Sequence, residues 1–397
     1  MHILMIAPEP FFEPRGTPFS EFHRIRALTT LGHTVDLVTY PFGRDVELPG
    51  LRIFRCLRPP LIRRVRIGPS WAKVPLDLSL AATALRRAAR GRYDAVHSHE
   101  EGGAIGVLLA TILRVPHLYD MHSSLPQQIA NFGYGRATWL ARLLGGLERM
   151  MVRRSRVVIV ICEDLLSTVR DLDASVPAVL IENASGDPPS PGAGSDVRRE
   201  LGVGPDTPVV LYTGTFEAYQ GLGLLYDAMA RVAARRPAAR LVMVGGEPAQ
   251  VEVARRDVSV RGLAASVVFT GQRPPADIPR FLDAATVLVS PRSTGTNTPL
   301  KIYQYLRSGR PIVATNLRTH TQVLSPETSF LVEPTAEAFA AGILEALDHP
   351  ARAADIGRRA RDVADTKYSD EAFLEKTERA LALLSEGNRA EMAGGAA

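Results

Sequence analysis

Apolar residues recur along this chain with two alternating periods. Short continuous apolar runs, such as HILMIAP at residues 2–8 and RVVIVIC at 156–162, are separated by segments in which apolar positions recur every three to four residues, such as 20–32. Continuous β-branched runs are typical of strands buried on both faces, and the longer period is typical of amphipathic helices. The alternation predicts an α/β protein built on parallel sheets covered by helices.

A change in composition divides this pattern into two parts. The stretch ENASGDPPSPGAGSD, beginning at residue 182, is rich in Pro, Gly and Ser and is typical of a linker. A second strand–helix alternation begins with PVVLYTG at 208–214 and continues through ARLVMVGG, SVVFTG, ATVLVSP, RPIVAT and SFLVEP. We expect two doubly wound domains, 1–184 and 185–368, with a helix at 369–386 that joins the first domain and a frayed tail at 387–397.

Composition narrows the cellular setting. With 46% hydrophobic and 22% charged residues, the 397-residue chain is typical of globular proteins. Its two cysteines, Cys56 and Cys162, are too few for a disulfide framework and indicate a reducing compartment. MHILMIAPEP has no basic segment or small-residue cleavage site, so it predicts a strand and not a signal peptide. No apolar run reaches the ~20 residues that span a bilayer, so we expect a cytoplasmic protein.

The positive charge is distributed unevenly along the chain, whose net charge is +5, and segment 57–73 is strongly basic. It carries Arg58, Arg63, Arg64, Arg66 and Lys73, interleaved with Leu61, Ile62, Val65, Ile67 and Trp71. Basic residues mixed with apolar ones suit a peripheral contact with an anionic membrane surface, here the inner face of the membrane. A solvated basic loop is the alternative. No nucleic-acid-binding module accompanies the segment, so we expect no nucleic-acid partner.

Several familiar ligand motifs are absent. EGGAIG at 101–106 lacks the first glycine of the dinucleotide fingerprint, and the chain has no P-loop and no nucleophile elbow. There is no Cys/His cluster for zinc, and the acidic DLD at 171–173 follows a helical segment and is typical of a solvated helix end. We therefore expect neither a metal site nor a cofactor.

One loop and helix carry the clearest candidate chemistry. PRSTGTNTPLKIYQYLRSGRPIVAT, residues 291–315, predicts a polar loop, a helix and a buried strand. The free N–H groups and the positive dipole end of a helix N-terminus bind anions well. Simple capping of a helix that packs on the sheet would explain the same pattern.

The order of these segments resembles the retaining glycosyltransferases of family 4. GTNTPLKIYQYLRSGRPIVAT is similar to the signature of that family, PVVLYTGTFEAYQGLGLL to its first nucleotide-domain strand and turn, and IENASGD to its interdomain segment. EPRGTP and DAVHSH are similar to its N-terminal loop and acceptor-side strand. The resemblance implies the GT-B fold, in which two Rossmann-like domains face each other across a cleft. It also implies a nucleotide-sugar donor and metal-independent transfer with retention.

The chain departs from the family pattern at four positions. The two glutamates of the family correspond to Thr296 and Gln304, and its Arg and Lys after the first C-domain strand correspond to Thr215 and Gln220. Gln304 can still bond a ribose hydroxyl, and Thr296 a donor-sugar hydroxyl. The charged replacements for the missing phosphate ligands are expected to be Arg292 and Lys301. The donor site would then comprise the loop, the helix and the first turn: Gly16, Gly214, Thr215, Arg292, Thr296, Asn297, Thr298, Lys301 and Gln304.

Three further residues follow strand ends in the first half of the chain. His122 matches the family histidine that meets the donor sugar and is the expected catalytic residue, with a capped loop histidine as the alternative. His99 and Glu100 are candidate acceptor contacts, or a loop that caps the next helix. Gly16 would let backbone approach the donor phosphate, with Arg15 as an additional cation, although a simple turn explains the glycine equally well. His320 is expected to be structural.

The resulting prediction is a hexosyltransferase that uses a nucleotide sugar and an unidentified acceptor, with a lipid-linked or envelope glycan as the leading class. One alternative is an inactive GT-B protein that binds nucleotide sugar and partners an active transferase, motivated by the four departures. A GT-B sugar-nucleotide epimerase or phosphorylase is a weaker alternative. The epimerase would need cleft carboxylates, of which Glu100 and Glu101 are the obvious ones.

Overall fold

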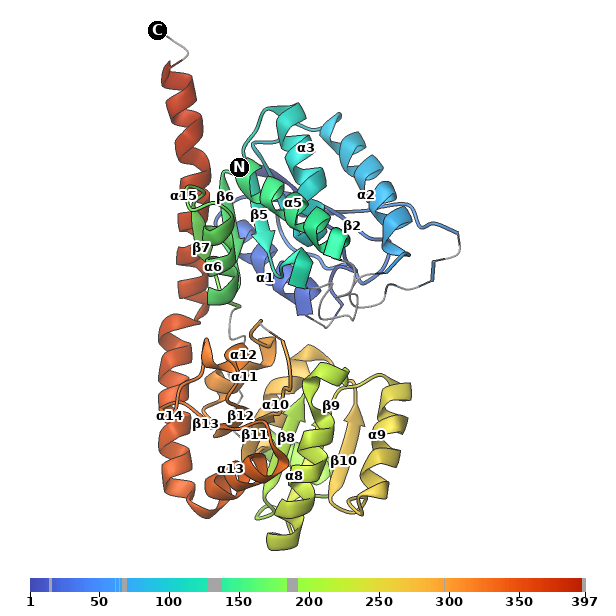
Figure 1. Ribbon diagram of the computed structural model, residues 1–397, viewed down its shortest axis with the longest axis vertical. Helices are drawn as coiled ribbons and strands as arrows, with labels where there is room; N and C mark the ends of the chain where they lie inside the picture. Colours follow the sequence, from blue (N-terminus) through green and yellow to red (C-terminus); the bar gives the residue numbers. More distant parts are fainter. Residues whose placement is uncertain are drawn as a thin grey trace. The chain divides into compact units, whose positions relative to one another are not determined.

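The chain forms two compact units. The computed structural model describes residues 1–13, 16–60, 62–63, 65, 70–127, 138–183, 192–295 and 297–394 (Figure 1). The first unit contains Met1–Asn183 and Glu371–Ala397, and the second contains Ala184–Asp370. The sequence places these boundaries at 184/185 and 368/369.

The first unit is built on a seven-stranded parallel sheet with the order β3-β2-β1-β4-β5-β6-β7. Its strands are β1 His2–Ala7, β2 Thr34–Thr39, β3 Leu51–Arg55, β4 Ala95–His99, β5 His117–Met121, β6 Val157–Val160 and β7 Ala178–Leu180. Its helices are α1 Gly16–Thr30, α2 Lys73–Ala88, α3 Gly103–Leu113, α5 Thr138–Arg154, α6 Glu163–Leu172 and α15 Asp370–Gly394, with a short 3₁₀ turn at Glu100–Gly102.

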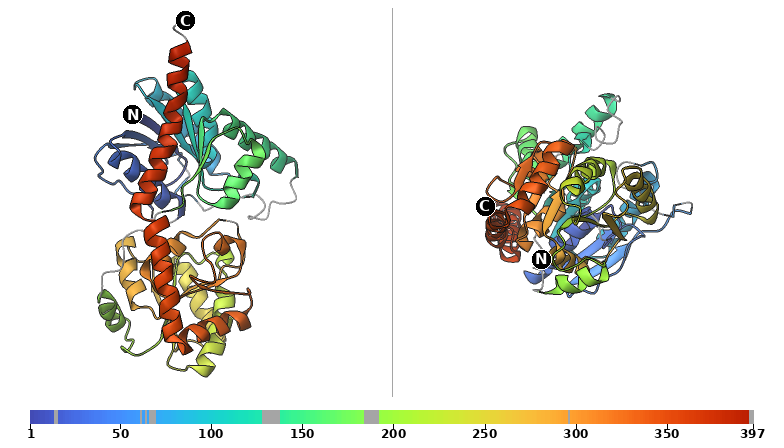
Figure 2. Two further views of the ribbon diagram at one scale, coloured as in Figure 1. Left: turned by 90° about the vertical axis from the view of Figure 1, so that its left-hand side faces the viewer. Right: turned by 90° about the horizontal axis from the view of Figure 1, so that it is seen from below.

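Alternation along the strands separates an apolar face of this sheet from a polar one. Val96 of β4 packs with Leu76 of α2 and Leu109 of α3 in one core. Because successive strand residues face opposite sides, His97 and His99 face the other side of the sheet. That side is covered by α1 and by α15, the terminal red helix that lies across this unit in Figure 2. The buried polar residues His97, His99 and Asp120 therefore lie between the sheet and these two helices.

The second unit contains a six-stranded parallel sheet with the order β10-β9-β8-β11-β12-β13. Its strands are β8 Val209–Thr213, β9 Arg240–Val244, β10 Val267–Gly271, β11 Val287–Ser290, β12 Ile312–Thr315 and β13 Phe330–Val332. Its helices are α7 Ala193–Glu200, α8 Leu222–Arg235, α9 Pro248–Val260, α10 Ile278–Ala284, α11 Leu300–Ser308, α12 Arg318–Thr321, α13 Ala336–Asp348 and α14 Pro350–Lys367, with 3₁₀ turns at Ala218–Gln220 and Pro275–Asp277. Two apolar cores cover the two faces of this sheet.

The predicted α/β class with two Rossmann-like units is confirmed, and both sheets are wholly parallel. Two boundaries differ from the prediction. Helix α1 begins at Gly16 instead of near Ser20, so Gly16 opens a helix instead of lying in a free turn. Helix α15 continues to Gly394, well past the expected end at 386, because Glu, Arg, Ala and Met are good helix formers and one glycine costs only about 1 kcal/mol.

Two features bear on the expected cellular setting. Both cysteines are buried thiols that form no disulfide. None of the helices in the described part of the chain combines the length and apolar character needed to cross a membrane.

Candidate functional site

The carboxyl edge of the second sheet is shaped by two glycines. Gly214 directly follows β8 and Gly245 directly follows β9, and both have positive φ, +137° and +125°. A Cβ built on Gly245 would overlap the carbonyl oxygen of Gly214. The two backbone segments can approach this closely because Gly245 has no side chain. A Cβ built on Gly214 would lie 3.5 Å from Nζ of Lys301, so this turn also borders a side chain of α11.

Lys301, in the first turn of α11, extends to this edge of the sheet. Only 8% of Lys301 is exposed, and its Nζ lies 3.9 Å from the centre of the Tyr212 ring. It donates to Oε1 of Gln220 over 3.4 Å. No carboxylate of a described residue lies within ion-pair distance of Nζ. Burial first, and then the nearby Arg292 guanidinium, lower the pKa of Lys301 well below its usual range.

Arg292 binds the backbone of the loop that precedes α11. Its guanidinium lies 5.0 Å from the centre of the Tyr219 ring, and it donates to the carbonyl oxygens of Thr294 and Asn297 over 3.0 and 2.8 Å. Burial lowers the pKa of Arg292. The guanidinium thus shapes the loop and also adds positive charge close to Lys301.

Of the remaining predicted donor residues, Thr215, Thr298 and Gln304 belong to the same unit as this pair of cations. Thr215 Oγ1 accepts a 3.3 Å hydrogen bond from Gln220, so the two positions that depart from the family pattern contact each other. Thr298 is buried, and its hydroxyl has no hydrogen-bond partner among the described residues. Gln304 is half-buried on α11. Two predicted phosphate or sugar contacts, Arg15 and Thr296, lie outside the described residues.

His320 lies at the same edge of the sheet but supports the backbone. Its ring contacts Ser290 Oγ at 2.8 Å and the carbonyl oxygen of Thr315 at 2.9 Å. Burial lowers the pKa of His320 to about 4, so the ring is neutral at pH 7. These contacts support the structural role expected for it.

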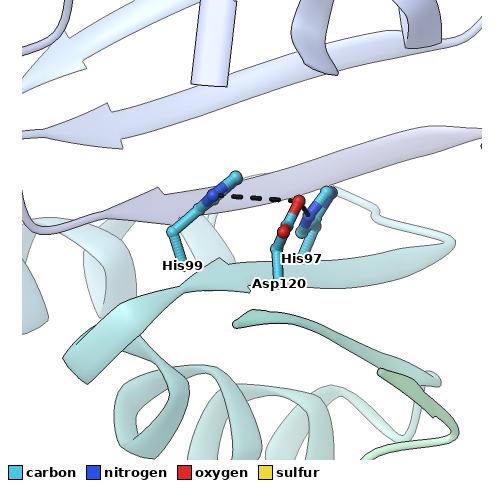
Figure 3. A group of neighbouring side chains, drawn as sticks. All are labelled: His97, His99 and Asp120. Carbon is cyan, nitrogen blue, oxygen red and sulfur yellow. Dashed lines mark ion pairs between the residues drawn. The ribbon is translucent and has the colours of Figure 1, made fainter. Parts of the chain in front are cut away.

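A second cluster lies at the carboxyl ends of β4 and β5 in the first unit. The register pairs His99 with Asp120, and His97 is on the same face of the sheet. Figure 3 shows the Asp120 carboxylate between the two imidazole rings. Asp120 Oδ2 lies 3.5 Å from Nε2 of His97 and 4.0 Å from Nδ1 of His99. All three side chains are buried.

Arg24 of α1 neutralises this carboxylate. Its Nε donates to Asp120 Oδ2 over 2.9 Å, and both side chains are almost wholly buried. Burial alone would raise the pKa of the Asp120 carboxyl, but Arg24 and then His122 outweigh it and hold the pKa well below its usual range. Asp120 is therefore a buried anion with a fixed partner.

His122 and His99, predicted separately from the sequence, are brought together here. His122 Nε2 lies 3.3 Å from Nδ1 of His99, with which it shares a hydrogen bond, and 3.1 Å from Asp120 Oδ1. Glu100 has a left-handed backbone, with φ of +48°, and its carboxylate accepts from Ser123 Oγ over 2.8 and 3.0 Å. Burial raises the pKa of Glu100 to about 8.

This cluster also offers ligand atoms for a cation. His97, His99 and Asp120 each present one, all within 4.8 Å of one another, a grouping the sequence analysis did not foresee. However, the Asp120 oxygen that faces both rings is the one to which Arg24 donates. A divalent ion would meet a buried guanidinium at that oxygen, so the donor set fits a proton network better than a metal.

Sequence reasoning missed two members of the cluster, His97 and Arg24. The alternation in HSH at 97–99 already placed both histidines on one face of a strand, and the buried side of α1 carried the arginine. Only the strand register and the packing of α1 show that these residues meet Asp120.

Part of the basic segment 57–73, which was expected to contact a membrane, packs into the first unit. Val65 is buried in the core, and Lys73 forms an ion pair with Glu101. Arg63 is exposed, and Trp71 is 90% exposed. Four residues of the predicted patch lie outside the described part of the chain: Leu61, Arg64, Arg66 and Ile67.

Family models match both halves of the chain. Residues 23–184 match the family described as "Glycosyl transferase 4-like domain", and residues 207–349 match "Glycosyl transferases group 1". The two matches fall within the first and the second unit, respectively, apart from Ala184.

Individual relatives match most of the chain, but at low sequence identity. The chain is 24% identical over 347 residues to the sulfoquinovosyl transferase SQD2 of Arabidopsis thaliana, covering 83% of this chain and 63% of that protein. It is 27% identical over 359 residues to a D-inositol 3-phosphate glycosyltransferase of Acidothermus cellulolyticus, covering 84% of this chain and 78% of the relative.

Solved structures show the same fold. HepE from Anabaena, in complex with UDP, has a TM-score of 0.74 at 18% identity and covers 96% of this chain and 100% of its own. Sucrose-phosphate synthase from Thermosynechococcus elongatus has a TM-score of 0.74 at 22% identity, with all of both chains covered. With both of its halves matched by glycosyltransferase families and its two parallel-sheet units matched by these structures, the chain is a glycosyltransferase with the GT-B fold.

Proposed function

We propose that this enzyme transfers a hexose from a nucleotide sugar to an acceptor with retention, and that its second unit binds the donor diphosphate through Lys301. The observation that carries the proposal is the buried ammonium of Lys301, which has no carboxylate partner among the described residues. HepE, whose fold this chain shares, has been solved with UDP and with UDP-glucose, which supports a nucleotide-sugar donor.

The physical reason is that an uncompensated buried cation is costly. Removing an ammonium from water costs several kcal/mol unless an anion or several acceptors replace the hydration. The Tyr212 ring face and one amide oxygen compensate for only part of that cost. A bound diphosphate would supply the missing negative charge, and it would raise the depressed pKa of Lys301 towards its usual value.

The surroundings of Lys301 suit a diphosphate. Lys301 is in the first turn of α11, where backbone N–H groups and the helix dipole also favour an anion. Arg292 adds a second positive charge. Charge that develops on the leaving diphosphate would thus be stabilised by protein groups, in keeping with metal-independent transfer.

The other donor residues have roles consistent with their chemistry. We assign the half-buried amide of Gln304 to a ribose hydroxyl and the Thr298 hydroxyl, together with Asn297, to polar atoms of the donor. His122 is proposed to contact the transferred sugar, and His99 and Glu100 to act on the acceptor side.

An inactive protein that only binds nucleotide sugar is the competing function. The uncharged pair Thr215 and Gln220 favours it, because these positions supply no cation for the leaving group. Lys301 argues against an inactive protein. Its ammonium contacts the side-chain oxygen of Gln220 and so supplies a positive charge beside a position where the family has a cation.

Calorimetry followed by a turnover assay separates the two functions. UDP, GDP and ADP, and then the matching nucleotide sugars, are titrated in EDTA, and every binder is assayed for slow hydrolysis of the sugar. Binding with hydrolysis supports the transferase and identifies the donor base. Binding without turnover supports the inactive alternative, and no binding by any nucleotide refutes both.

We further propose that the acceptor is a lipid-linked or envelope glycan, reached by peripheral contact of α2 with an anionic membrane. One side of α2 is buried through Leu76 and Leu80, whereas Val74, Leu78 and Leu85 are exposed. These three recur at intervals of four and seven residues and form a single stripe. The exposed Trp71 just precedes the helix.

Basic residues flank this exposed apolar stripe. Arg63 is exposed in the preceding segment, and Arg86 is exposed in the last turn of α2. Shallow insertion of apolar side chains combined with charge attraction is how amphipathic helices bind anionic bilayers. Each arginine near such a surface contributes ~1 kcal/mol.

Vesicle co-sedimentation tests the membrane contact. Replacing Arg63 and Arg86 with Gln should weaken binding to vesicles of phosphatidylcholine mixed with phosphatidylglycerol about 30-fold, with little effect on phosphatidylcholine alone. Trp71→Ser should weaken it as well. Val260→Ser, which alters an exposed apolar residue of α9 in the other unit, is the matched control. Equal binding by all these variants would refute the membrane proposal.

A further inference from the structure

The buried cluster of the first unit continues beyond the two histidines into the C-terminal helix. Arg24, which donates to Asp120 through Nε, also donates through Nη1 to Thr377 Oγ1 over 3.2 Å. The ring of Phe373 lies against the same guanidinium, 4.8 Å from Cζ to the ring centre. Thr377 and Phe373 are buried residues of α15. A continuous chain of contacts thus runs from α15 through Arg24 and Asp120 to His122.

We propose that Asp120 and Arg24 are positioning residues for the His99–His122 pair, and that α15 holds Arg24 in place through Thr377 and Phe373. The proposal rests on the assignment of His122 to the transferred sugar. It adds a role for α15, which returns to the first unit after the chain has completed the second.

The geometry of the carboxylate supports this role. Asp120 Oδ2 faces Arg24, whereas Oδ1 lies 3.1 Å from His122 Nε2. A carboxylate held on one side by a guanidinium can rotate little, so its other oxygen has a fixed position. The anion therefore favours a proton on Nε2 of His122, and in the neutral ring this leaves the lone pair on Nδ1.

His99 completes the arrangement. Burial is the largest influence on His99 and lowers its pKa well below the usual range, so this ring stays neutral. A neutral His99 can share one proton with His122 Nε2 over the 3.3 Å contact.

Arg24 connects the His99–His122 pair to α15 because the N–H donors of a guanidinium have a fixed planar arrangement. One donor reaches the carboxylate and another reaches Thr377, so movement of α15 would change the direction of both bonds. Thr377 Oγ1 also donates to the carbonyl oxygen of Phe373 over 2.8 Å, which fixes the hydroxyl within the helix.

The charged and titratable groups that interact with this cluster come from four parts of the first unit: Glu9 after β1, Glu21 and Arg24 on α1, His97, His99 and Glu100 at the end of β4, and Asp120 on β5. Variants of α15 alter none of these charges directly, so they test the coupling most cleanly.

The decisive variants change one contact at a time. Thr377→Val removes the hydroxyl and keeps the shape, while Thr377→Ser keeps the hydroxyl. Arg24→Lys keeps the charge but loses the fork, and Asp120→Asn removes the anion. Lys376→Met is the matched control. Lys376 is next to Thr377 on α15, and its replacement removes an ion pair with Glu182 while leaving Arg24 unchanged.

Two readouts are needed, and the first does not depend on turnover. Imidazole ¹⁵N resonances of His122, assigned by their loss in His122→Gln, report its proton position and titration. We expect Thr377→Val and Arg24→Lys to shift these resonances, and Thr377→Ser and Lys376→Met to leave them unchanged. In turnover, Asp120→Asn should lower kcat about 10- to 100-fold and Thr377→Val about fivefold, with an altered pH profile and little change in KM.

The outcomes distinguish this inference from the proposed function. Unchanged His122 resonances and an unchanged pH profile in Thr377→Val and Arg24→Lys would overturn the coupling, even if the enzyme is a transferase. Shifted resonances support the coupling even if no turnover is found, in which case only the transferase assignment fails. Where Asp120→Asn does not fold, the conservative changes at Thr377 and Arg24 still decide the question.

Discussion

Replacing Lys301 with methionine should weaken ligand binding without lowering folding stability. Met is unbranched, of similar length, and packs well against an aromatic ring, so it can occupy the space over Tyr212. The substitution removes a buried ammonium that has no carboxylate partner among the described residues. Lost contacts to Tyr212 and Gln220 are offset by the relief of desolvation. We expect the free energy of unfolding without nucleotide to stay constant or rise.

The effect on binding follows from the lost contact to phosphate. A hydrogen bond to a charged group contributes ~1.5–3 kcal/mol, which corresponds to an increase in Kd of about 10- to 100-fold for the nucleoside diphosphate. Titration calorimetry measures this change directly. Lys376→Met, which removes a partly exposed lysine paired with Glu182, is the control for loss of charge alone and should bind like the wild type.

Proton uptake gives an independent check of the same reasoning. The pKa of Lys301 is depressed in the folded protein, so a bound diphosphate raises it and binding takes up protons. The observed enthalpy should therefore depend on the ionisation enthalpy of the buffer in the wild type but not in Lys301→Met. Between the folded pKa and the unfolded value of ~10.4 the unfolded chain binds more protons, so stability without nucleotide rises with pH there, and the variant should lose that slope. An unchanged Kd together with unchanged proton uptake would remove Lys301 from the donor site.

Three further experiments test other parts of the structure. Gly245→Ala should lower the free energy of unfolding by at least ~1–3 kcal/mol in urea titrations, because its Cβ would overlap the Gly214 carbonyl oxygen. The control Gly223→Ala, in open space on α8, should raise it by ~0.5–1 kcal/mol, and equal effects would contradict the close approach of Gly245 to Gly214. Burial lowers the pKa of His117 to about 3, so the folded state keeps this ring neutral, and stability should fall as pH drops from ~6.5 towards that value. His117→Gln should flatten this dependence in unfolding experiments at pH 7 and pH 5, and an identical slope would exclude His117 as its source. Gln304→Glu should keep or improve donor affinity in calorimetry, and a large loss would mean that the amide itself is required.

Much of the fold follows from local sequence patterns. The runs that became β1, β6, β8 and β11 are almost entirely apolar, as burial on both faces of a parallel sheet favours. Helix ends were predicted less well: α1 starts before the expected residue and α15 ends after it, because an apolar period does not mark the residues at which a helix begins and ends.

Some features of the candidate site could likewise be predicted from the sequence, and others could not. His122, His99 and Lys301 could be selected from the sequence because each lies at a strand end or near the start of a helix. The state of Lys301 could not be predicted, since a first-turn lysine is normally solvated, and only the tertiary structure shows it buried against Tyr212.

The sequence by itself determined the two parallel-sheet units and the strand ends at which polar residues gather, because periodicity and turn chemistry act over a few neighbouring residues. Only the tertiary structure decided which of those residues meet. Arg24 and Thr377 are separated by 353 positions yet share a hydrogen bond, since α1 and α15 cover the same face of one sheet. Such a contact depends on the packing of whole helices and on the buried charge of Asp120, and no local pattern in the chain contains that information.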